Sequence, residues 1–499
     1  MIRKNTTSFI ILFLFFISTG FSQTVTDSAI IKLSEEVQKF SLNHALKNAK
    51  WGICVITADS GKTVFAKNDS LLLIPASTMK AISTAAGLSM LGSKYTFKTQ
   101  LLYDGTIDKD STLHGNLYIK GGGDPSLGSP RIDTMNNIKY MIPEWVNIIQ
   151  SKGIKKIEGA IVGDASILDD TIVPPSWVDG DIGFYYGAGA SGLSFHENNF
   201  LISITCGKKY RDSARITEID PIIPYIKFEN KAWTGSPHYV GNLWAYGKPY
   251  ENKRTITGIV PRNYKDFKMR LSLPDPAAFC AYSLYKALTD TGITVTDSAT
   301  TYKDLVSAKK NTYKERTLIY THTSPTLDTL VYYTNHKSIN SYAENILKVL
   351  AYEKTGKGST IIGTQLVKAY WKMKGVNLNG FVMKDGSGLS TENKVSPRQL
   401  AEMMRANISD STFAVYYHSL PSAGISGTIK TMLKGTIAEN NLRAKSGYMK
   451  KIRSYTGYVY NKQNKLLTFG IIVNNHTASA IGMRTMLEKI MVMIAETEW

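Results

Sequence analysis

The sequence contains only three cysteines in 499 residues, Cys54, Cys206 and Cys280. Their spacing does not match that of a metal site, so we predict that the protein holds no metal and needs no other cofactor. In an exported chain an odd number of cysteines leaves at least one thiol unpaired. Cys54 and Cys206 lie in apolar runs, which favours buried free thiols.

Several common catalytic and nucleotide-binding motifs are also absent. There is no G-x-S-x-G run of the kind that carries the nucleophile of α/β-hydrolases. His196-Glu197 lacks the second histidine of a zinc-protease helix. The Gly-Lys pairs at Gly61 and Gly356 lack the first glycine of a phosphate-binding loop, because Ile56 and Ala351 occupy its place. The sequence therefore gives no support to these three classes of enzyme.

After its first residues the chain has no apolar stretch long enough for a transmembrane helix. At the N-terminus, Arg3 and Lys4 precede a short apolar run from Phe9 to Ile17, and cleavage near Gln23 is plausible. No cysteine follows that could carry a lipid anchor, and an uncleaved anchor is the alternative. We predict that residues 1–23 are a signal peptide, that the protein is secreted across the inner membrane into the periplasm, and that any membrane association is peripheral.

Acidic residues are scarce relative to basic ones. The chain has 40 Asp and Glu against 59 Lys and Arg, a formal net charge of +19. Such a charge would suit nucleic acid, but the lysines are dispersed and no basic run reaches five residues. We therefore predict no nucleic-acid partner. A basic surface would favour anionic polymers of a cell envelope.

The hydrophobic patterns predict an α+β, multidomain protein, since 499 residues exceed a single ordinary core. Short strand-like runs separated by Gly, Pro and Asp turns extend from about residue 101 to about 300 and predict a β-rich insert. The helical patterns lie at 26–50, 75–91, 326–333, 340–352 and 361–374, and the strand patterns at 51–57, 63–67, 443–446, 454–461 and 466–474. We predict one domain made of residues 24–100 and 318–499, split by an insert of residues 101–317.

A last helical stripe carries Met483, Leu487, Ile490 and Ile494 on one face. This stripe could lie on a membrane surface. The opposite face carries Glu488 and little basic charge, which suits an anionic membrane poorly. We therefore predict that the stripe faces the protein core.

Ser77-Thr78-Met79-Lys80 is the first candidate for catalysis. It lies at the start of a predicted helix, where a spacing of three residues puts the serine hydroxyl and the lysine amine on one face. A neutral lysine can act as the base for a serine nucleophile, and burial or a nearby cation raises its neutral fraction. Taken alone, the motif is weak, because a helix cap followed by a solvated lysine has the same pattern.

Two further candidates follow later in the chain. Ser338-Ile339-Asn340 precedes a predicted helix whose Ser341 and Glu344 resemble a capping box, so the loop is predicted to be firmly held. Lys445-Ser446-Gly447 lies on a predicted strand, where a cation, a hydroxyl and an open backbone could recognise a carboxylate. Each has a structural alternative, helix capping in one case and an edge-strand lysine in the other.

The three motifs together change this assessment. S-x-x-K, S-x-N and K-[ST]-G in this order are the signature of penicillin-binding proteins and serine β-lactamases. The chain resembles the low-molecular-mass class C penicillin-binding proteins, the DacB-type D-alanyl-D-alanine carboxypeptidase/endopeptidases. The resemblance rests on Pro75–Lys80, Gly121–Pro125, Tyr186–Ser194, Lys337–Asn340, Asp385–Ser390, Leu420–Gly424 and Arg443–Gly447.

This resemblance implies a β-lactamase-like transpeptidase domain, an antiparallel sheet with helices, and a serine acyl-transfer mechanism on peptidoglycan stem peptides. It implies that Ser77 is the nucleophile, Lys80 its base and Ser338 a proton relay. Asn340 would hold the substrate amide. Lys445, Ser446 and Gly447 would form the edge that binds the terminal carboxylate, and the backbone N–H groups of Ser77 and Tyr448 would form the oxyanion hole. β-Lactams would be inhibitors.

The sequence departs from the family pattern at Ser446, where threonine is commoner, and at Ile339, where a polar residue is often found. The first change keeps a hydroxyl group, whereas the second puts substrate contacts at that position in question. Two alternatives use the same motifs: a serine β-lactamase, and a cell-wall-binding protein with an inactive site. The large insert argues against the first, and the intact motifs argue against the second.

Overall fold

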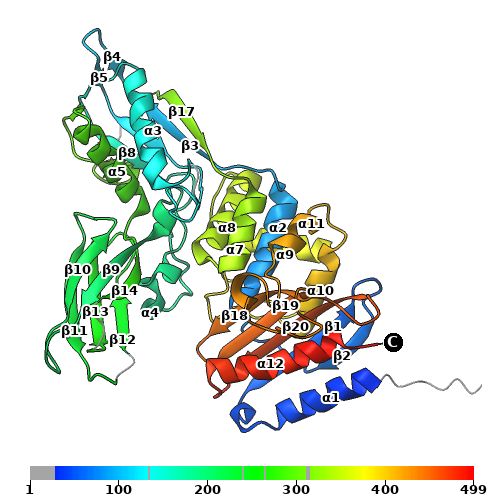
Figure 1. Cartoon of the computed structure of the whole chain (residues 1–499). Helices are drawn as coiled ribbons and strands as arrows, with labels where there is room; N and C mark the ends of the chain where they lie inside the picture. The colour runs from blue at the N-terminus through cyan, green and yellow to red at the C-terminus, as the bar shows by residue number, and fades with distance from the viewer. Residues whose placement is uncertain (1–27, 133–134, 239–240, 263–265, 311–314, 499) are drawn as a thin grey trace, which may run out of the picture.

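A computed structural model describes residues 28–132, 135–238, 241–262, 266–310 and 315–498. The predicted signal peptide, residues 1–23, lies outside them. Figure 1 shows two parts side by side, one formed by the two ends of the chain and the other by its middle. Within the described residues, no helix has the length and apolar character needed to cross a membrane.

The part formed by the chain ends is built on one antiparallel sheet in the order β18-β19-β20-β1-β2. Its strands are β1 (Lys50–Thr57), β2 (Thr63–Lys67), β18 (Arg443–Met449), β19 (Ile452–Tyr460) and β20 (Leu466–Asn474). β1 pairs with β20 from Lys50↔Asn474 to Thr57↔Leu467. This pairing brings the start and the end of the chain together, and with them the first and third motifs.

Helices cover both faces of this sheet. α1 (Ser28–Ser41) and α12 (Ala480–Ala495) pack together on one face (Figure 1), where Val37, Phe40 and Leu487 belong to a buried cluster with the strands. The stripe on α12 therefore faces the core, as predicted. Other helices form a second cluster against the sheet: α2 (Met79–Leu91), α7 (Leu327–Lys337), α8 (Asn340–Thr355), α9 (Thr360–Met373), α10 (Pro397–Asn407) and α11 (Phe413–Ser419).

The chain leaves this part along β3 (Lys98–Tyr103) and returns along β17 (Thr317–Thr323), and these two strands pair with each other. They lie in the sheet β16-β8-β6-β3-β17. Its other strands are β6 (Leu117–Lys120), β8 (Ile161–Asp164) and β16 (Thr300–Thr301). A four-stranded sheet accompanies it, with β4 (Thr106–Ile107), β5 (Thr112–His114), β7 (Lys156–Ile157) and β15 (Thr294–Val295).

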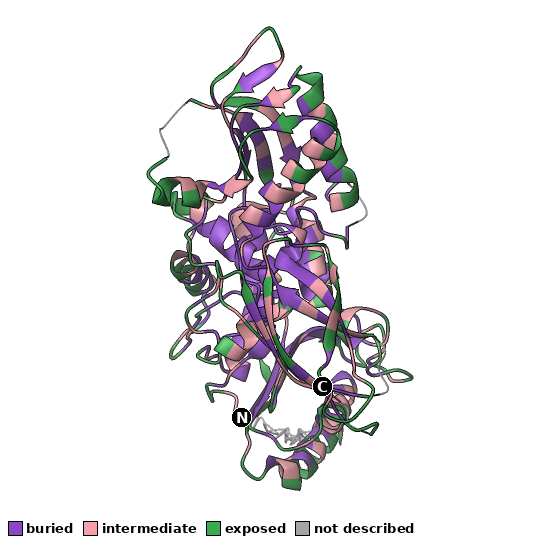
Figure 2. Cartoon of the chain, turned by 90° about the vertical axis from the view of Figure 1, so that its left-hand side faces the viewer, coloured by how far each residue is buried: buried purple, intermediate pink, exposed green. Residues whose placement is uncertain are grey.

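Two three-stranded sheets complete the middle of the chain. They contain β9 (Asn199–Thr205), β10 (Arg215–Asp220) and β14 (Phe267–Ser272) in one, and β11 (Lys227–Thr234), β12 (Asn242–Tyr246) and β13 (Lys253–Val260) in the other. The apolar residues of this region form a buried cluster of their own between Leu101 and Val295. Figure 2 shows buried residues gathered towards the middle of the molecule and exposed ones on its outer loops and helices.

The middle of the chain is less purely β than its turn pattern predicts. It also contains α3 (Ile138–Ser151), α5 (Pro276–Asp290) and the shorter α4 (Asp179–Ile182) and α6 (Tyr302–Ser307). α3 has Pro143 in its interior, which argues against a helix locally. Burial of Met141, Trp145 and Ile149 on one face outweighs that local preference.

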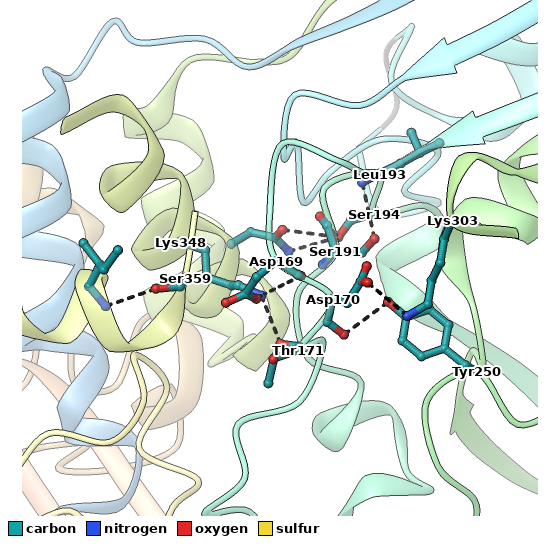
Figure 3. Close-up of polar contacts among 12 residues, drawn as sticks. Asp169, Asp170, Thr171, Ser191, Leu193, Ser194, Tyr250, Lys303, Lys348 and Ser359 are labelled. Carbon is teal, nitrogen blue, oxygen red and sulfur yellow. Dashed lines mark hydrogen bonds and ion pairs between the residues drawn. The ribbon is translucent and has the colours of Figure 1, made fainter. Parts of the chain in front are cut away.

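Buried polar contacts join the two parts (Figure 3). Lys348 of α8 is 1% exposed, and its Nζ lies 2.7 Å from Asp169 and donates to the carbonyl of Thr171 at 3.0 Å. Asn345, one turn earlier, donates to the Ser194 hydroxyl at 3.1 Å. Because such groups cost free energy when they lose their partners in the interior, these contacts fix how the middle of the chain sits against α8.

The three cysteines are free thiols. Cys54 and Cys280 are buried, and burial raises the pKa of the Cys54 thiol to about 12. Cys206 is only half-buried, and its thiol donates to the carbonyl of Arg262. The prediction of a buried free thiol therefore holds for Cys54 and only in part for Cys206.

Candidate active site

Ser77 lies in a 3-10 turn, Ala76–Thr78, that leads directly into α2. Ala76 has a φ of 49°, a left-handed conformation that is costly for a residue with a Cβ atom. Hydrogen bonds hold the turn: the hydroxyls of Thr78 and Ser454 both donate to the carbonyl of Pro75. This strained turn places Ser77 and its hydroxyl just before the first residue of α2, outside the regular helix.

Lys80 is one turn further along α2 and is fully buried. Its Nζ lies 3.0 Å from Ser77 Oγ, 2.5 Å from Asn340 Oδ1 and 2.8 Å from the carbonyl oxygen of Ser387. Burial lowers the pKa of Lys80 to about 7, while the carboxylates of Asp385 and Glu344 oppose the shift. A substantial share of neutral amine is thus available at neutral pH to accept the proton of Ser77.

The second motif lies where two helices meet. α7 ends at Ser338, which adopts a left-handed φ of 56°, and α8 begins at Asn340. The Asn340 amide oxygen accepts a hydrogen bond from the Lys80 amine. Its Nδ2 donates to the backbone carbonyl of Tyr186 at 2.7 Å. Asn340 therefore connects Lys80 to the middle of the chain.

The capping box predicted for Ser341 and Glu344 is wrong. The N-cap of α8 is Ile339, which makes no side-chain cap, and Ser341 lies inside the helix. Glu344 is buried, and its two oxygens accept from the backbone N–H groups of Gly386 and Ser387 at 3.1 and 2.7 Å. Burial, and then the charge of Asp385, raises the pKa of Glu344 to about 7. Glu344 therefore holds the loop that contains Ser387, whose carbonyl oxygen accepts a hydrogen bond from Lys80.

Asp385 holds the same loop from the other side. Its oxygens accept from the backbone N–H groups of Gly388 and Ser390 at 2.9 and 2.6 Å, and from Asn393 Nδ2 at 2.7 Å. The indole N–H of Trp177, from the middle of the chain, donates to it at 2.7 Å. The loop Asp385–Ser390 is therefore a rigid support for Lys80.

The third motif lies on β18, the edge strand nearest Ser77. Lys445 is fully buried and donates to Ser338 Oγ at 3.0 Å and to the carbonyl of Ser446 at 2.8 Å. Burial, and then the positive charge of Lys80, holds the pKa of Lys445 well below its usual range. Because the Lys445 amine is buried, the polar groups that this edge presents to solvent are the hydroxyls of Ser446 and Thr428, which lie 2.7 Å apart.

Gly447 lets this strand approach the nucleophile closely. A Cβ atom built there would lie 2.2 Å from Ser454 Oγ, 2.7 Å from the Pro75 carbonyl oxygen and 3.0 Å from the Ser77 nitrogen. Any side chain would therefore push β18 away from Ser77. The close approach brings the backbone of Tyr448, the next residue, beside that of Ser77.

A cleft of about 900 Å³ opens beside Ser77, Ser338 and Asn340. It is lined by residues from both parts of the molecule: Ser77, Ser338, Asn340, Gly388, Leu389, Tyr448 and Met449 from one, and Arg131, Asp181, Tyr185, Tyr186, Glu197, Trp244 and Arg270 from the other. No three His, Cys, Asp or Glu side chains among the described residues are arranged to hold a metal ion. The lining offers the hydroxyls of Ser77 and Ser338, the amide of Asn340, the carboxylates of Asp181 and Glu197, and two guanidinium groups.

The structure thus brings all three sequence motifs together. Ser77 and Asn340 are both hydrogen-bonded to Lys80, Ser338 and Ser446 are both hydrogen-bonded to Lys445, and Gly447 lies against the turn of Ser77. Sequence reasoning missed the supporting residues Glu344, Asp385, Trp177, Tyr186 and Thr428. Asp385 and Tyr186 lie in stretches that carry the family resemblance, but those stretches did not indicate what the side chains contact.

Comparisons with known proteins identify the family of this chain. The model of the family described as D-Ala-D-Ala carboxypeptidase 3 (S13) matches residues 33–496. The chain is 24% identical to the D-alanyl-D-alanine carboxypeptidase of Actinomadura sp. (strain R39), over 92% of this chain and 85% of that protein. It is 23% identical to the D-alanyl-D-alanine carboxypeptidase DacB of Haemophilus influenzae, over 94% and 93%.

Solved structures share the fold. Penicillin binding protein 4 (dacB) from Haemophilus influenzae superposes with a TM-score of 0.80 at 21% identity, covering 93% of this chain and 99% of that one. The same protein complexed with a β-lactam gives a TM-score of 0.72 at 20% identity, covering 92% and 97%.

Proposed function

This chain belongs to the D-Ala-D-Ala carboxypeptidase 3 (S13) family, and from that premise we propose that it cleaves D-Ala-D-Ala ends or cross-links of peptidoglycan stem peptides through an acyl-enzyme on Ser77. The observation that carries the proposal is the pairing of Ser77 Oγ with the buried amine of Lys80 at 3.0 Å. An amine whose pKa is lowered to about 7 is a base matched to neutral pH.

Acylation begins with the terminal carboxylate of the substrate at Ser446 and Thr428, beside the buried amine of Lys445. Lys80 takes the proton of Ser77, and the Ser77 oxygen attacks the carbonyl carbon of the penultimate D-Ala. The backbone N–H groups of Ser77 and Tyr448 donate to the developing oxyanion. The close packing of Gly447 against the Ser77 turn supports this assignment.

Breakdown of the tetrahedral intermediate needs a proton on the leaving amine. Ser338 Oγ accepts a hydrogen bond from Lys445 Nζ at 3.0 Å, and Lys445 is close enough to Lys80 for the two charges to interact. Ser338 passes its proton to the leaving D-Ala amine and is reprotonated by the Lys80 ammonium, which carries the proton taken from Ser77; Asn340 holds the substrate amide. Water then attacks the ester carbonyl, Ser77 leaves with a proton, and the shortened peptide is released.

The proposal extends to where the protein works and how it is divided. Residues 1–23 direct export, and the mature chain acts in the periplasm, where stem peptides are found. Residues 24–100 and 318–499 form the peptidase domain, and 101–317 form the insert. The separate buried cluster between Leu101 and Val295 supports this division.

The test is the mass of the intact protein after incubation with benzylpenicillin, for the mature chain and for Ser77→Ala. We expect a stable adduct, of the mass of the intact drug, on the first and none on the second. Hydrolysis of a D-Ala-D-Ala peptide should be lost in the same variant. Penicillin consumed without an adduct would indicate a β-lactamase instead, and penicillin unchanged without an adduct would contradict acyl-enzyme chemistry altogether.

A further inference from the structure

The cleft that contains Ser77 continues onto the middle of the chain, where its wall carries two arginines. Arg131 and Arg270 line the same cleft as Ser77 and Asn340. The wall is joined to the catalytic centre, because the carbonyl of Tyr186 accepts from Asn340 at 2.7 Å. The mechanism above uses neither arginine.

Glu197 anchors this pair of arginines from a strained turn. His196, Glu197 and Asn198 have φ values of 54°, 55° and 53°, three successive left-handed residues that all carry a Cβ atom. A left-handed conformation is costly for a residue with a Cβ atom, so the surrounding structure must hold the turn in place. It does so through Asn198, which donates to Ser194 Oγ at 3.0 Å and accepts from the Phe195 N–H at 3.0 Å.

The hydrogen bonds to the Glu197 carboxylate come from groups other than Arg270. Its side chain is 3% exposed and accepts from Arg131 through two bonds of 2.9 Å, from Ser129 at 2.8 Å and from Tyr342 at 3.3 Å. Although Arg131 donates two hydrogen bonds to Glu197, 27% of its side chain is exposed to the cleft. One buried carboxylate thus faces two guanidinium groups, which leaves the cluster with one net positive charge.

Arg270 carries the unneutralised charge. Its nearest approach to Glu197 is 3.7 Å, beyond hydrogen-bonding distance, and 37% of its side chain is exposed. The guanidinium lies over the ring of Tyr185 at 4.9 Å, which orients it without using its N–H groups. Among the residues that the structure describes, no acceptor forms a hydrogen bond with it, so its planar fork of donors is available to a ligand.

We propose that Arg270, supported by Arg131, binds a carboxylate on the substrate. A planar guanidinium held by an aromatic ring matches the two oxygens of a carboxylate. The proposal rests on the proposed function. Since the terminal carboxylate of the leaving D-Ala is assigned to Ser446 and Thr428, the second carboxylate belongs to the part of the stem peptide that stays on Ser77. The insert thereby selects acidic stem peptides over neutral ones.

The experiment compares matched peptides that differ only in one charge. Both peptides of the first pair are lysyl-D-Ala-D-Ala with an acetyl group on the lysine α-amine. The side-chain amine carries a succinyl group, which is an acid, in one peptide and a succinamyl group, which is a neutral amide, in the other. The second pair reverses the two positions. The ratio of kcat/KM for the acid to that for the amide is measured in the mature protein, in Arg270→Gln and in Arg270→Lys. The matched control is Arg215→Gln, which changes an exposed arginine on β10, in the same sheet as Arg270 but separated from its strand by β9.

The unmodified protein should prefer the acid of at least one pair by about tenfold, as expected for a charge-assisted contact that is partly exposed. Arg270→Gln should bring the ratio close to one. Arg270→Lys should keep part of the preference because it retains the charge but not the fork. Arg215→Gln should retain the full ratio, and added salt should weaken the preference wherever it exists.

Two results would overturn the proposal: equal use of acid and amide in both pairs by the unmodified protein, or an undiminished preference in Arg270→Gln. The first needs no variant, so a failure of Arg270→Gln to fold leaves the proposal testable. If the unmodified protein hydrolyses none of the peptides and takes up no penicillin, the proposed function itself has failed. Hydrolysis without preference removes only the arginine subsite.

Discussion

Trp177 donates its indole N–H to Asp385 at 2.7 Å, although the two residues are 208 positions apart. Asp385 holds the loop in which the Ser387 carbonyl accepts a hydrogen bond from the Lys80 amine. The middle of the chain is thus connected to the catalytic lysine through a buried hydrogen bond, in addition to the contact between Tyr186 and Asn340.

Removing that donor should weaken both the fold and the site. In Trp177→Phe the ring remains but Asp385 loses one bond inside the protein, so we expect the free energy of unfolding to fall by about 1–2 kcal/mol beyond the effect of the smaller ring. The rate of acylation by benzylpenicillin should fall as the loop gains freedom. Urea unfolding and stopped-flow acylation measure the two effects.

Trp145→Phe is the matched control. Trp145 is also fully buried, but among the described residues its Nε1 has no hydrogen-bond partner. It should lose only the contribution of the smaller ring. If both variants lost the same stability and acylated at the same rate, the bond between Trp177 and Asp385 would have no measurable role.

The pH dependence of acylation should report Lys80. The amine is a base only when neutral, and its pKa is lowered to about 7 by burial. Below that pH the protonated fraction grows, so the acylation rate should fall about tenfold per pH unit, and above it the rate should level off. Lys80→Arg should acylate negligibly throughout, because arginine stays charged. A rate independent of pH between about 5 and 9 would be inconsistent with Lys80 as the base.

Changing the charge beside Lys80 should move that profile. In Asn340→Asp a carboxylate replaces the amide oxygen that lies 2.5 Å from Lys80 Nζ. A negative charge at this distance favours the ammonium form, so the pKa of Lys80 should rise by about 1–3 units and the rising limb should move to higher pH. The variant's thermal midpoint serves as the check on folding. A slower reaction with an unshifted limb would assign Asn340 to substrate binding alone.

Gly447→Ala should separate β18 from the nucleophile. The new Cβ would meet Ser454 Oγ at 2.2 Å and the Pro75 carbonyl at 2.7 Å, so the strand must shift. Losing the alignment of one oxyanion donor costs roughly 100-fold or more in rate, and overpacking costs about 1–3 kcal/mol of stability. Acylation and urea unfolding are measured alongside Gly180→Ala, where an added Cβ meets open space. Normal acylation by the Gly447→Ala variant would show that the strand can yield without harm.

The short-range features of this protein were predictable. The strands β1 and β2, the helices α7 to α9 and the strands of the closing sheet lie close to their predicted ranges, because each carries a clear period and a turn or cap at its ends. The helix predicted for 26–50 is shorter, since α1 ends at Ser41 and a 3-10 turn, His44–Leu46, follows. α5 was missed although Asp275 and Pro276 are a recognisable helix start.

The sequence by itself determined the family and the residues expected at the site, because S-x-x-K, S-x-N and K-S-G are local patterns that residue type and spacing alone define. Only the tertiary structure decided the pKa of Lys80 and which residues support and surround the site. Burial lowers the pKa of Lys80, and Glu344 and Asp385 support it from loops that no local pattern connects. Arg270 and Trp177 reach the cleft and the loop only once β3 and β17 have folded the insert back. The physical reason is that desolvation, charge coupling and packing depend on distances through space, which spacing along the chain does not encode.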